Sequence, residues 1–188
     1  MNPKSIFVLL ILFAFLWGAG CERIKDGVHK EYYKNGNVMA EGFLKDNRLE
    51  GSYKLYSENG NLKSISSYQH GEREGLYKLY LYNGTLMEES NYKEDKLDGI
   101  SKHYNEDGSL YMETNFVNGK VEGKHKVYFK NESLNAEWNY KNNKRDGLAK
   151  SYGLDGKLTM EWDYKDDRCI RVRTFDAAGH LASDKECK

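Results

Sequence analysis

A glycine recurs every 24 residues through most of this 188-residue chain, and this period constrains the fold more than any other feature of the sequence. The spacing does not slip, and the glycines are Gly27, Gly51, Gly75, Gly99, Gly123 and Gly147. A fixed period of about 20 to 50 residues is typical of repeat proteins, in which each unit buries its apolar face against its neighbours. The sequence therefore predicts six units starting at these glycines, followed by a degenerate capping unit from about residue 170.

Each unit contains two turn signals. With the glycine as position 1, positions 9 and 10 carry pairs such as Asn35-Gly36, which favour a two-residue type I′ turn with positive φ at both residues. A second turn-prone pair at positions 20 and 21, such as Asn118-Gly119, joins one hairpin to the next. No segment of the repeats has a helical period. We therefore expect an all-β fold over 27–188, an elongated single-layer antiparallel meander of repeated β-hairpins.

The turn at positions 9 and 10 also predicts the pairing of the strands. Residues whose positions sum to 19 should face each other, which places the lysine at position 4 opposite position 15, a glutamate in five of six units. The same register places the position-1 glycines opposite an aromatic column at position 18; the first unit departs from it, with Phe43 one residue early. The sequence thus predicts a Lys–Glu ladder on one face and a moderately apolar opposite face.

The pattern G-x-x-K-x-Y-x-x-N-G-x-L, followed by an aromatic residue six positions later, resembles the MORN repeat in its bacterial variant. The resemblance covers Gly27 to about Leu181. It implies an open sheet of hairpins whose motif residues are structural. Bacterial proteins of this kind look like those labelled antitoxin-like, and eukaryotic members are associated with membranes, lipid head groups and scaffolding. The resemblance therefore implies a binding protein without naming its partner.

The beginning of the chain is typical of an export signal. Lys4 precedes an apolar run, Ile6 to Trp17, which is too short to span a bilayer and fits the hydrophobic region of a signal peptide. We expect a signal peptide over 1–20 and a protein exported to the bacterial cell envelope.

A cysteine follows this leader directly. The stretch Gly18-Ala19-Gly20-Cys21 resembles the bacterial lipobox, in which small residues precede a cysteine that is lipidated and becomes the mature N-terminus. We expect lipidation of Cys21 and a short tether over 21–26, which would anchor the protein to a membrane. The alternative is ordinary cleavage of the leader, which leaves Cys21 as a free thiol.

Two further cysteines lie near the end of the chain. Cys169 and Cys187 could close a disulfide around the C-terminal segment in an oxidising compartment, or remain two free thiols. No spacing of cysteines and histidines suggests a metal site, and we expect no metal and no cofactor.

Two tryptophans break the repeat. Position 16 is Ser66, Ser90 and Thr114 before it becomes Trp138 and Trp162. Exposed Trp and Tyr suit a protein-binding hot spot or a platform for a sugar. The alternative is that the rings thicken the apolar face near the end of an open sheet. The candidate binding surface consists of Trp138, Tyr140, Trp162, Tyr164 and Phe129.

Several classes of function are disfavoured. The 29 basic and 29 acidic residues balance, so the chain lacks the basic surplus of a nucleic-acid-binding protein. The five histidines occupy unrelated repeat positions and pair with no nucleophile or ligand set, which argues against an enzyme. The leading interpretation is a non-catalytic, membrane-tethered lipoprotein that presents a β-ribbon to an unidentified protein partner. The alternatives are an antitoxin-like or immunity protein and a cell-envelope glycan-binding module, and the exposed sheet edges allow self-association through edge strands.

Overall fold

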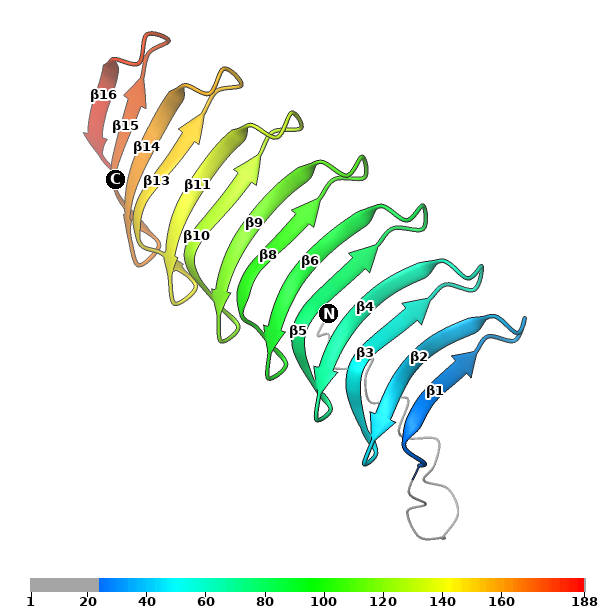
Figure 1. The fold of residues 1–188 in the computed structure, drawn as a ribbon. Helices are drawn as coiled ribbons and strands as arrows, with labels where there is room; N and C mark the ends of the chain where they lie inside the picture. The colour runs from blue at the N-terminus through cyan, green and yellow to red at the C-terminus, as the bar shows by residue number, and fades with distance from the viewer. Residues whose placement is uncertain (1–23, 188) are drawn as a thin grey trace.

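The computed structural model describes residues 24–187, which form one open antiparallel sheet of 16 strands (Figure 1). The strands are β1 (Gly27–Tyr32), β2 (Val38–Lys45), β3 (Arg48–Tyr56), β4 (Leu62–Gln69), β5 (Glu72–Tyr80), β6 (Leu86–Lys93), β7 (Lys96–Leu97), β8 (Gly99–Tyr104), β9 (Leu110–Val117), β10 (Lys120–Tyr128), β11 (Leu134–Lys141), β12 (Lys144–Arg145), β13 (Gly147–Tyr152), β14 (Leu158–Lys165), β15 (Arg168–Phe175) and β16 (Leu181–Glu186). Each hairpin pairs with the next hairpin along the chain, which confirms the predicted all-β meander.

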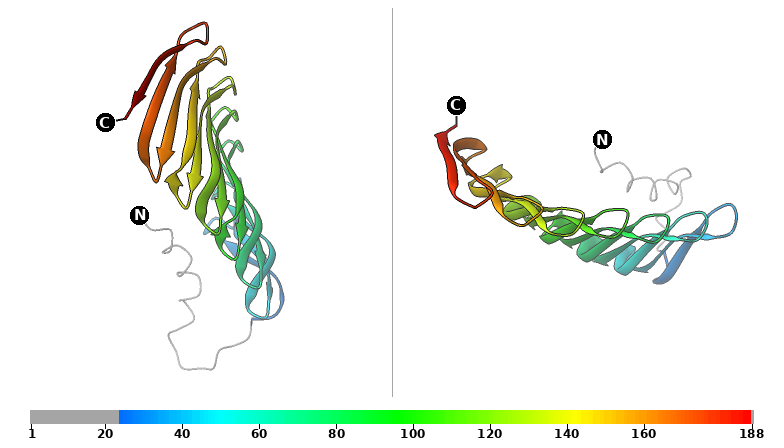
Figure 2. Two further views of the ribbon diagram at one scale, coloured as in Figure 1. Left: turned by 90° about the vertical axis from the view of Figure 1, so that its left-hand side faces the viewer. Right: turned by 90° about the horizontal axis from the view of Figure 1, so that it is seen from above.

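The sheet is a single elongated layer that curves and twists along its length, with β1 and β16 at opposite ends (Figures 1 and 2). The short strands β7 and β12 pair with β6 and β11 and are separated from β8 and β13 by one residue each. The predicted signal peptide and the predicted lipidation site, Cys21, lie outside the described residues. Within the described part of the chain, no helix is long and apolar enough to cross a membrane.

The two kinds of turn differ from the prediction. At the first hairpin, the N–H of Tyr33 donates to Asn37 O (2.8 Å) and the N–H of Gly36 donates to Tyr33 O (3.0 Å), which encloses a three-residue loop. Only Gly36 has a positive φ, 86°, so the predicted two-residue type I′ turn is wrong here. The reason is the side chain of Asn35, whose Oδ1 accepts a hydrogen bond from Asn37 N at 3.0 Å and holds an Asx turn.

The type I′ geometry occurs instead at positions 20 and 21, between the repeats. Asp46 and Asn47 have φ values of 49° and 60°, as the two central residues of a type I′ turn require. The corresponding pairs in later units also have positive φ, as in Asn142 and Asn143. The tight turns therefore connect the units, and the looser turns lie at the hairpin tips.

The predicted register is nevertheless confirmed. Tyr32 pairs with Val38 and Glu31 with Ala40, so a bulge at Met39 absorbs the extra residue of the longer loop. Position 4 consequently faces position 15 in all six units, and the pairs are Lys30–Glu41, Lys54–Ile65, Lys78–Glu89, Lys102–Glu113, Lys126–Glu137 and Lys150–Glu161.

The Lys–Glu ladder forms ion pairs in most units. The distance from Nζ to the nearest carboxylate oxygen is 3.1 Å for Lys30–Glu41 and 2.9 Å for Lys78–Glu89. In the fifth unit, Lys124 rather than the facing lysine contacts Glu137, at 2.8 Å. These lysines are partly exposed, so each ion pair stabilises the folded state by up to about 1 kcal/mol. The main effect of the ladder is to favour one strand register over the others.

The glycine column has a conformational cause. Gly51 has a φ of 75° and lies in a bulge, because Gly42 pairs with Tyr53 while Phe43 pairs with Glu50. Only glycine adopts this backbone without strain, and bulges bend and twist the strands that contain them. Bulges of this kind at the junctions between units, from Gly51 to Gly147, contribute to the curvature of the ribbon.

An acidic residue precedes each of these glycines and joins successive units. Glu50 Oε2 accepts a hydrogen bond from His70 N at 2.9 Å, and Glu122 Oε2 accepts one from Asn142 N at 2.8 Å. Each carboxylate thus satisfies a backbone donor in the turn that follows the next hairpin. Sequence reasoning missed this column, although position 24 is acidic in five of the six units, and the sixth carries Ile170.

The buried residues lie on the face opposite the ladder, at positions 3, 14, 16 and 18, and most are small. They are Ala40, Ser64, Ser66, Tyr68, Ser90, Ser101, Thr114, Ala136 and Ala149. Large rings lie beside them: a Cβ on Gly42 would be 2.7 Å from Tyr53 Cδ2, and Tyr53 meets Tyr68 edge to face with centroids 6.0 Å apart. We call this face the inner face. It is more polar than predicted, because small residues, most of them serine or threonine, lie between the large rings of this single layer.

The last two strands form a seventh hairpin, in which Arg173 faces Asp184 as position 4 faces position 15. A disulfide joins Cys169 in β15 to Cys187 just after β16, with Cα atoms 5.7 Å apart. The N–H of Cys187 also donates to Ile170 O at 3.1 Å. The disulfide therefore holds β16 to β15 at the open end of this hairpin, in addition to the backbone pairing of the two strands.

Candidate functional site

The two tryptophans lie on the inner face at equivalent places in neighbouring units. Trp138 lies in β11 and Trp162 in β14, and both side chains are partly exposed. Ala149 in β13, which is 1% exposed, pairs with Trp162, and the Glu137–Lys150 pair sets the register that brings it opposite Trp138. Because adjacent strands are about 4.8 Å apart, the two indoles are attached about 10 Å apart on either side of a small residue.

A histidine joins this group of rings. The imidazole centroid of His125 lies 5.5 Å from that of Trp138 and 5.9 Å from that of Tyr140. Its Nδ1 is 2.8 Å from Thr114 Oγ1, and burial lowers the pKa of His125 below its ordinary value. Sequence reasoning found the five histidines at unrelated repeat positions and did not place His125 with the aromatic residues. The available signal was position 3, where two earlier units carry Tyr53 and Tyr77.

Tyr164 belongs to a contact that an earlier unit repeats. The guanidinium carbon of Arg145 lies 4.3 Å from the Tyr164 ring centroid, and Arg145 Nε is 3.3 Å from Asp167 Oδ1. Arg73 lies over Tyr92 in the same way, at 3.9 Å. A contact that recurs in different units stabilises the sheet, so Tyr164 is a weaker candidate for a binding residue than the two tryptophans.

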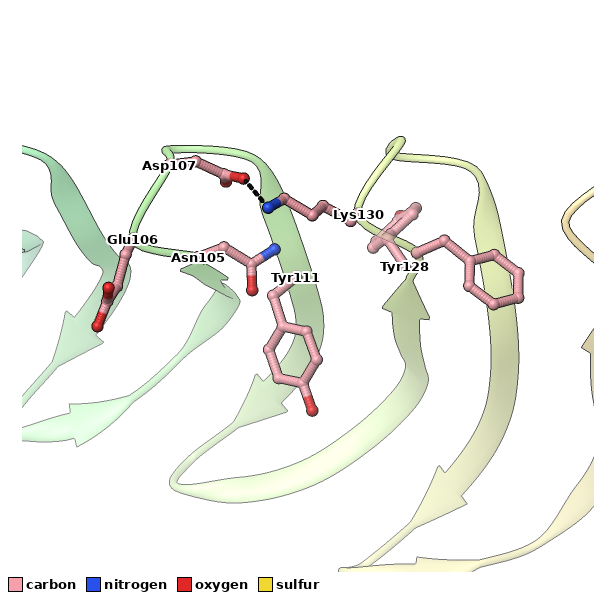
Figure 3. A pocket seen from close by; sticks show the side chains of 7 residues that line it. Asn105, Glu106, Asp107, Tyr111, Tyr128 and Lys130 are labelled. Atoms are coloured by element: carbon pink, nitrogen blue, oxygen red, sulfur yellow. Dashed lines mark ion pairs between the residues drawn. The ribbon is translucent and has the colours of Figure 1, made fainter.

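Phe129 lies away from the tryptophans, at a hairpin tip. It lines a groove of about 660 Å³ between two successive tips, together with Tyr111 and Tyr128 (Figure 3). Lys130 closes the outer side of this groove through an ion pair with Asp107, at 3.2 Å. Hydrogen bonds from Ser109 and Lys130 hold the pKa of Asp107 at about 2. The structure therefore divides the five residues of the candidate binding surface between two places.

A buried polar network lies on the inner face of the central units. Ser90 Oγ is 2.7 Å from Glu88 Oε1 and 2.7 Å from Ser101 Oγ, which is 3.5 Å from His103 Nε2. The two serines are 0% and 2% exposed, so a substrate cannot reach their hydroxyls. Satisfied hydroxyls of this kind are structural. No group of three potential metal ligands occurs among residues 24–187.

The period, the register and the paired turns recur six times, and the MORN repeat variant matches the chain in the same phase. The matches cover residues 25–46, 49–70, 73–94, 97–118, 121–142 and 145–166. The chain belongs to the MORN repeat variant family. No match was found among curated proteins. The MORN assignment supports a repeat protein involved in binding, on a fold that is typically non-catalytic. The hairpin of β15 and β16 follows the sixth matched repeat.

Proposed function

We propose that this MORN repeat protein is an exported bacterial lipoprotein, tethered to a membrane through Cys21, that binds another protein on the inner face around Trp138 and Trp162. The observation that carries the proposal is the break at position 16, where small residues give way to two tryptophans in adjacent units. Tryptophan is enriched in binding hot spots because it buries a large rigid surface. The function is display of a surface and involves no catalysis.

The surroundings of the tryptophans support this role. Ala149 separates them and His125 borders Trp138, so the rings rest on a packed base while part of each indole remains exposed. The neighbouring strands are continuous and paired, which fixes the position of both rings before a partner arrives. A preformed aromatic surface loses little side-chain entropy on binding.

The partner class follows from the chemistry of the rings. An antitoxin-like or immunity role is one form of the same proposal, in which the bound protein is a toxin. The indoles could also stack on the apolar face of a sugar, as in a cell-envelope glycan-binding module. Protein is favoured because the two indoles and the half-buried imidazole of His125 form a largely aromatic surface of the kind that is enriched in protein-binding hot spots.

Capture of partners from solubilised envelopes tests the binding surface. The variant W138S/W162S installs the residue that Ser66 and Ser90 already provide at this position, so the fold should be retained, as circular dichroism would check. Tyr82→Ser is the matched control, because it removes an aromatic side chain that is 83% exposed at a hairpin tip. Loss of two hot-spot residues weakens binding by about 100-fold or more.

The outcomes separate the alternatives. A protein captured by the native chain and by Tyr82→Ser, but lost from W138S/W162S, supports the proposal. Equal capture by all three chains would place the binding surface elsewhere. Enrichment of envelope glycan without protein would favour the glycan-binding module.

The tether has its own test. Mass spectrometry of the N-terminal peptide should show acylated Cys21, and Cys21→Ser should move the protein from the membrane fraction to the soluble fraction. A membrane-bound Cys21→Ser chain, or a native chain with an unmodified thiol, contradicts the tether.

A further inference from the structure

The first repeat carries an apolar patch on the face of the Lys–Glu ladder. Val28 in β1 pairs with Phe43 in β2, and the two residues are 67% and 41% exposed. Ile24, at the start of the described chain, is 48% exposed, and its N–H donates to Asn47 Oδ1 at 2.9 Å, which places it beside the turn that follows β2. We call Ile24, Val28 and Phe43 the first-repeat patch. It lies at the N-terminal end of the ribbon, next to the edge strand β1 (Figure 1).

The patch exists because the first unit breaks the repeat. Position 17 is polar in the five other units, which carry Ser67, Asn91, Asn115, Asn139 and Asp163. Only the first unit carries an aromatic residue there, and Leu44 takes the inner-face position opposite Gly27 that aromatic residues occupy elsewhere. The aromatic ring that other units place on the inner face therefore lies on the face of the Lys–Glu ladder in the first unit, as Phe43. A local departure from the pattern, without a gain in packing, is expected at a functional site.

We propose that the first-repeat patch inserts into the interfacial region of the membrane that holds the lipidated Cys21. The inference rests on the proposed tether. Ile24 is three residues after Cys21, so the chain cannot place the patch edge more than about 11 Å from the acylated residue. Exposed aromatic and aliphatic side chains held at that distance from a bilayer partition into its interface.

The insertion gives the ribbon an orientation as well as an anchor. A lipid on a flexible tether leaves the attached domain free to rotate. A second contact through β1 and β2 fixes the N-terminal end at the surface and leaves Trp138 and Trp162, four and five repeats away, clear of the bilayer. One end of the sheet then binds membrane, and the other end remains available to a partner protein.

Photo-cross-linking to lipid tests the insertion on the full chain. The native protein would be purified from membranes and reconstituted in phosphatidylglycerol–phosphatidylethanolamine vesicles that contain a photoactivatable lipid, and cross-linked peptides would be identified by mass spectrometry. Cross-links should concentrate in the hairpin of β1 and β2. They should persist in about 1 M NaCl, where charge interactions are screened within about 3 Å.

The substitutions use residues that the repeat already tolerates. Val28→Ser with Phe43→Asn installs the serine of Ser52 and the asparagine of Asn91 at the same positions, and should lower cross-linking about fivefold or more. Ile100→Ser is the matched control, because Ile100 occupies the position of Val28 in the fourth unit and is 50% exposed. It should leave the cross-linking unchanged.

Four results would overturn the inference. The first is native cross-linking in the Val28→Ser, Phe43→Asn chain, and the second is a detergent-stable dimer that the same substitutions abolish, which would assign the patch to a second copy. The third is an unmodified Cys21, which the mass of the N-terminal peptide from the same sample reveals and which removes the tether and the insertion together. Acylated Cys21 without cross-links in the first hairpin removes the insertion alone.

Discussion

Tyr128 Oη donates a hydrogen bond to Glu113 Oε2 across the junction between the fourth and fifth repeats, at 2.7 Å. The same bond joins the first two repeats, where Tyr56 Oη lies 2.9 Å from Glu41 Oε1. Burial, together with the hydrogen bond to Glu113, raises the pKa of Tyr128 above its ordinary value. At these two junctions, the tyrosine at position 6 and the glutamate at position 15 therefore connect one unit to the next.

Removing this hydroxyl should weaken the junction. We expect Tyr128→Phe to lower the free energy of unfolding by about 1–2 kcal/mol, because the bond has a charged acceptor and is partly buried. Chemical denaturation measures the change. Tyr80→Phe is the matched control, since the preceding unit carries Ile65 in place of the glutamate and offers no carboxylate at that position. Equal losses in both variants would show that the tyrosine ring, and not the hydrogen bond, stabilises the junction.

Stability should fall in mild acid because of His125. Burial lowers the pKa of His125 in the folded protein, so the unfolded chain takes up a proton at a higher pH than the folded chain does. Above the ordinary histidine pKa of about 6.5, His125 is neutral in both states and does not lower the free energy of unfolding. As the pH falls below that value toward the lowered pKa of His125 in the folded protein, the free energy of unfolding decreases.

Denaturant titrations at about pH 7.5 and at successively lower pH measure this slope. His125→Tyr should reduce it, because tyrosine occupies the same position in Tyr53 and Tyr77 and does not titrate in this range. His70→Gln is the control, since the His70 side chain is 77% exposed. A slope that His125→Tyr leaves unchanged would assign the acid sensitivity to other groups.

The fold could be predicted from the sequence because several repeat positions independently require the same strand register. Pairing Lys30 with Glu41 requires one register, and the same register brings the repeat glycines opposite the position-18 column. The turn at Asn35-Gly36 was predicted wrongly, since the pair alone does not reveal that Asn35 binds the N–H of Asn37. The bulge at Met39 corrects the register, and no residue type marks it.

The candidate site was less predictable, because it depends on which side chains approach across strands. Trp138 and Trp162 were found as breaks in a column, and the structure places them on one face. Phe129 was grouped with them by residue type, but the three-residue loop carries it to the hairpin tip. His125 was missed because its contacts with rings of β11 come from pairing, which residue type does not show.

The disulfide should stabilise the C-terminal hairpin. Cys169 and Cys187 are separated by 18 residues, and closing a loop of that length in the unfolded chain contributes about 3 kcal/mol. We expect the free energy of unfolding of the Cys169→Ser, Cys187→Ser chain to fall by up to that amount, and β16 to become susceptible to proteolysis first, because this terminal strand pairs only with β15. Cys21→Ser is the control, since it leaves the pair intact. Unchanged protection of β16 in the double variant would show that strand pairing alone holds the last strand.

The acidic column at position 24 should control the opening of the inter-repeat turns. Glu122 Oε2 accepts the hydrogen bond of Asn142 N at 2.8 Å, a charge-assisted bond to a donor that the type I′ turn leaves outside the strand ladder. We expect Glu122→Ala to cost about 1–2 kcal/mol and to speed amide hydrogen exchange at Asn142 more than at the other turns. Glu106→Ala is the control, because Glu106 is exposed at a hairpin tip. The effect should stay local, since each unit of the array contacts only its neighbours. Exchange that quickens evenly over all six turns would mean that the sheet opens as one cooperative unit and that Glu122 acts on global stability alone.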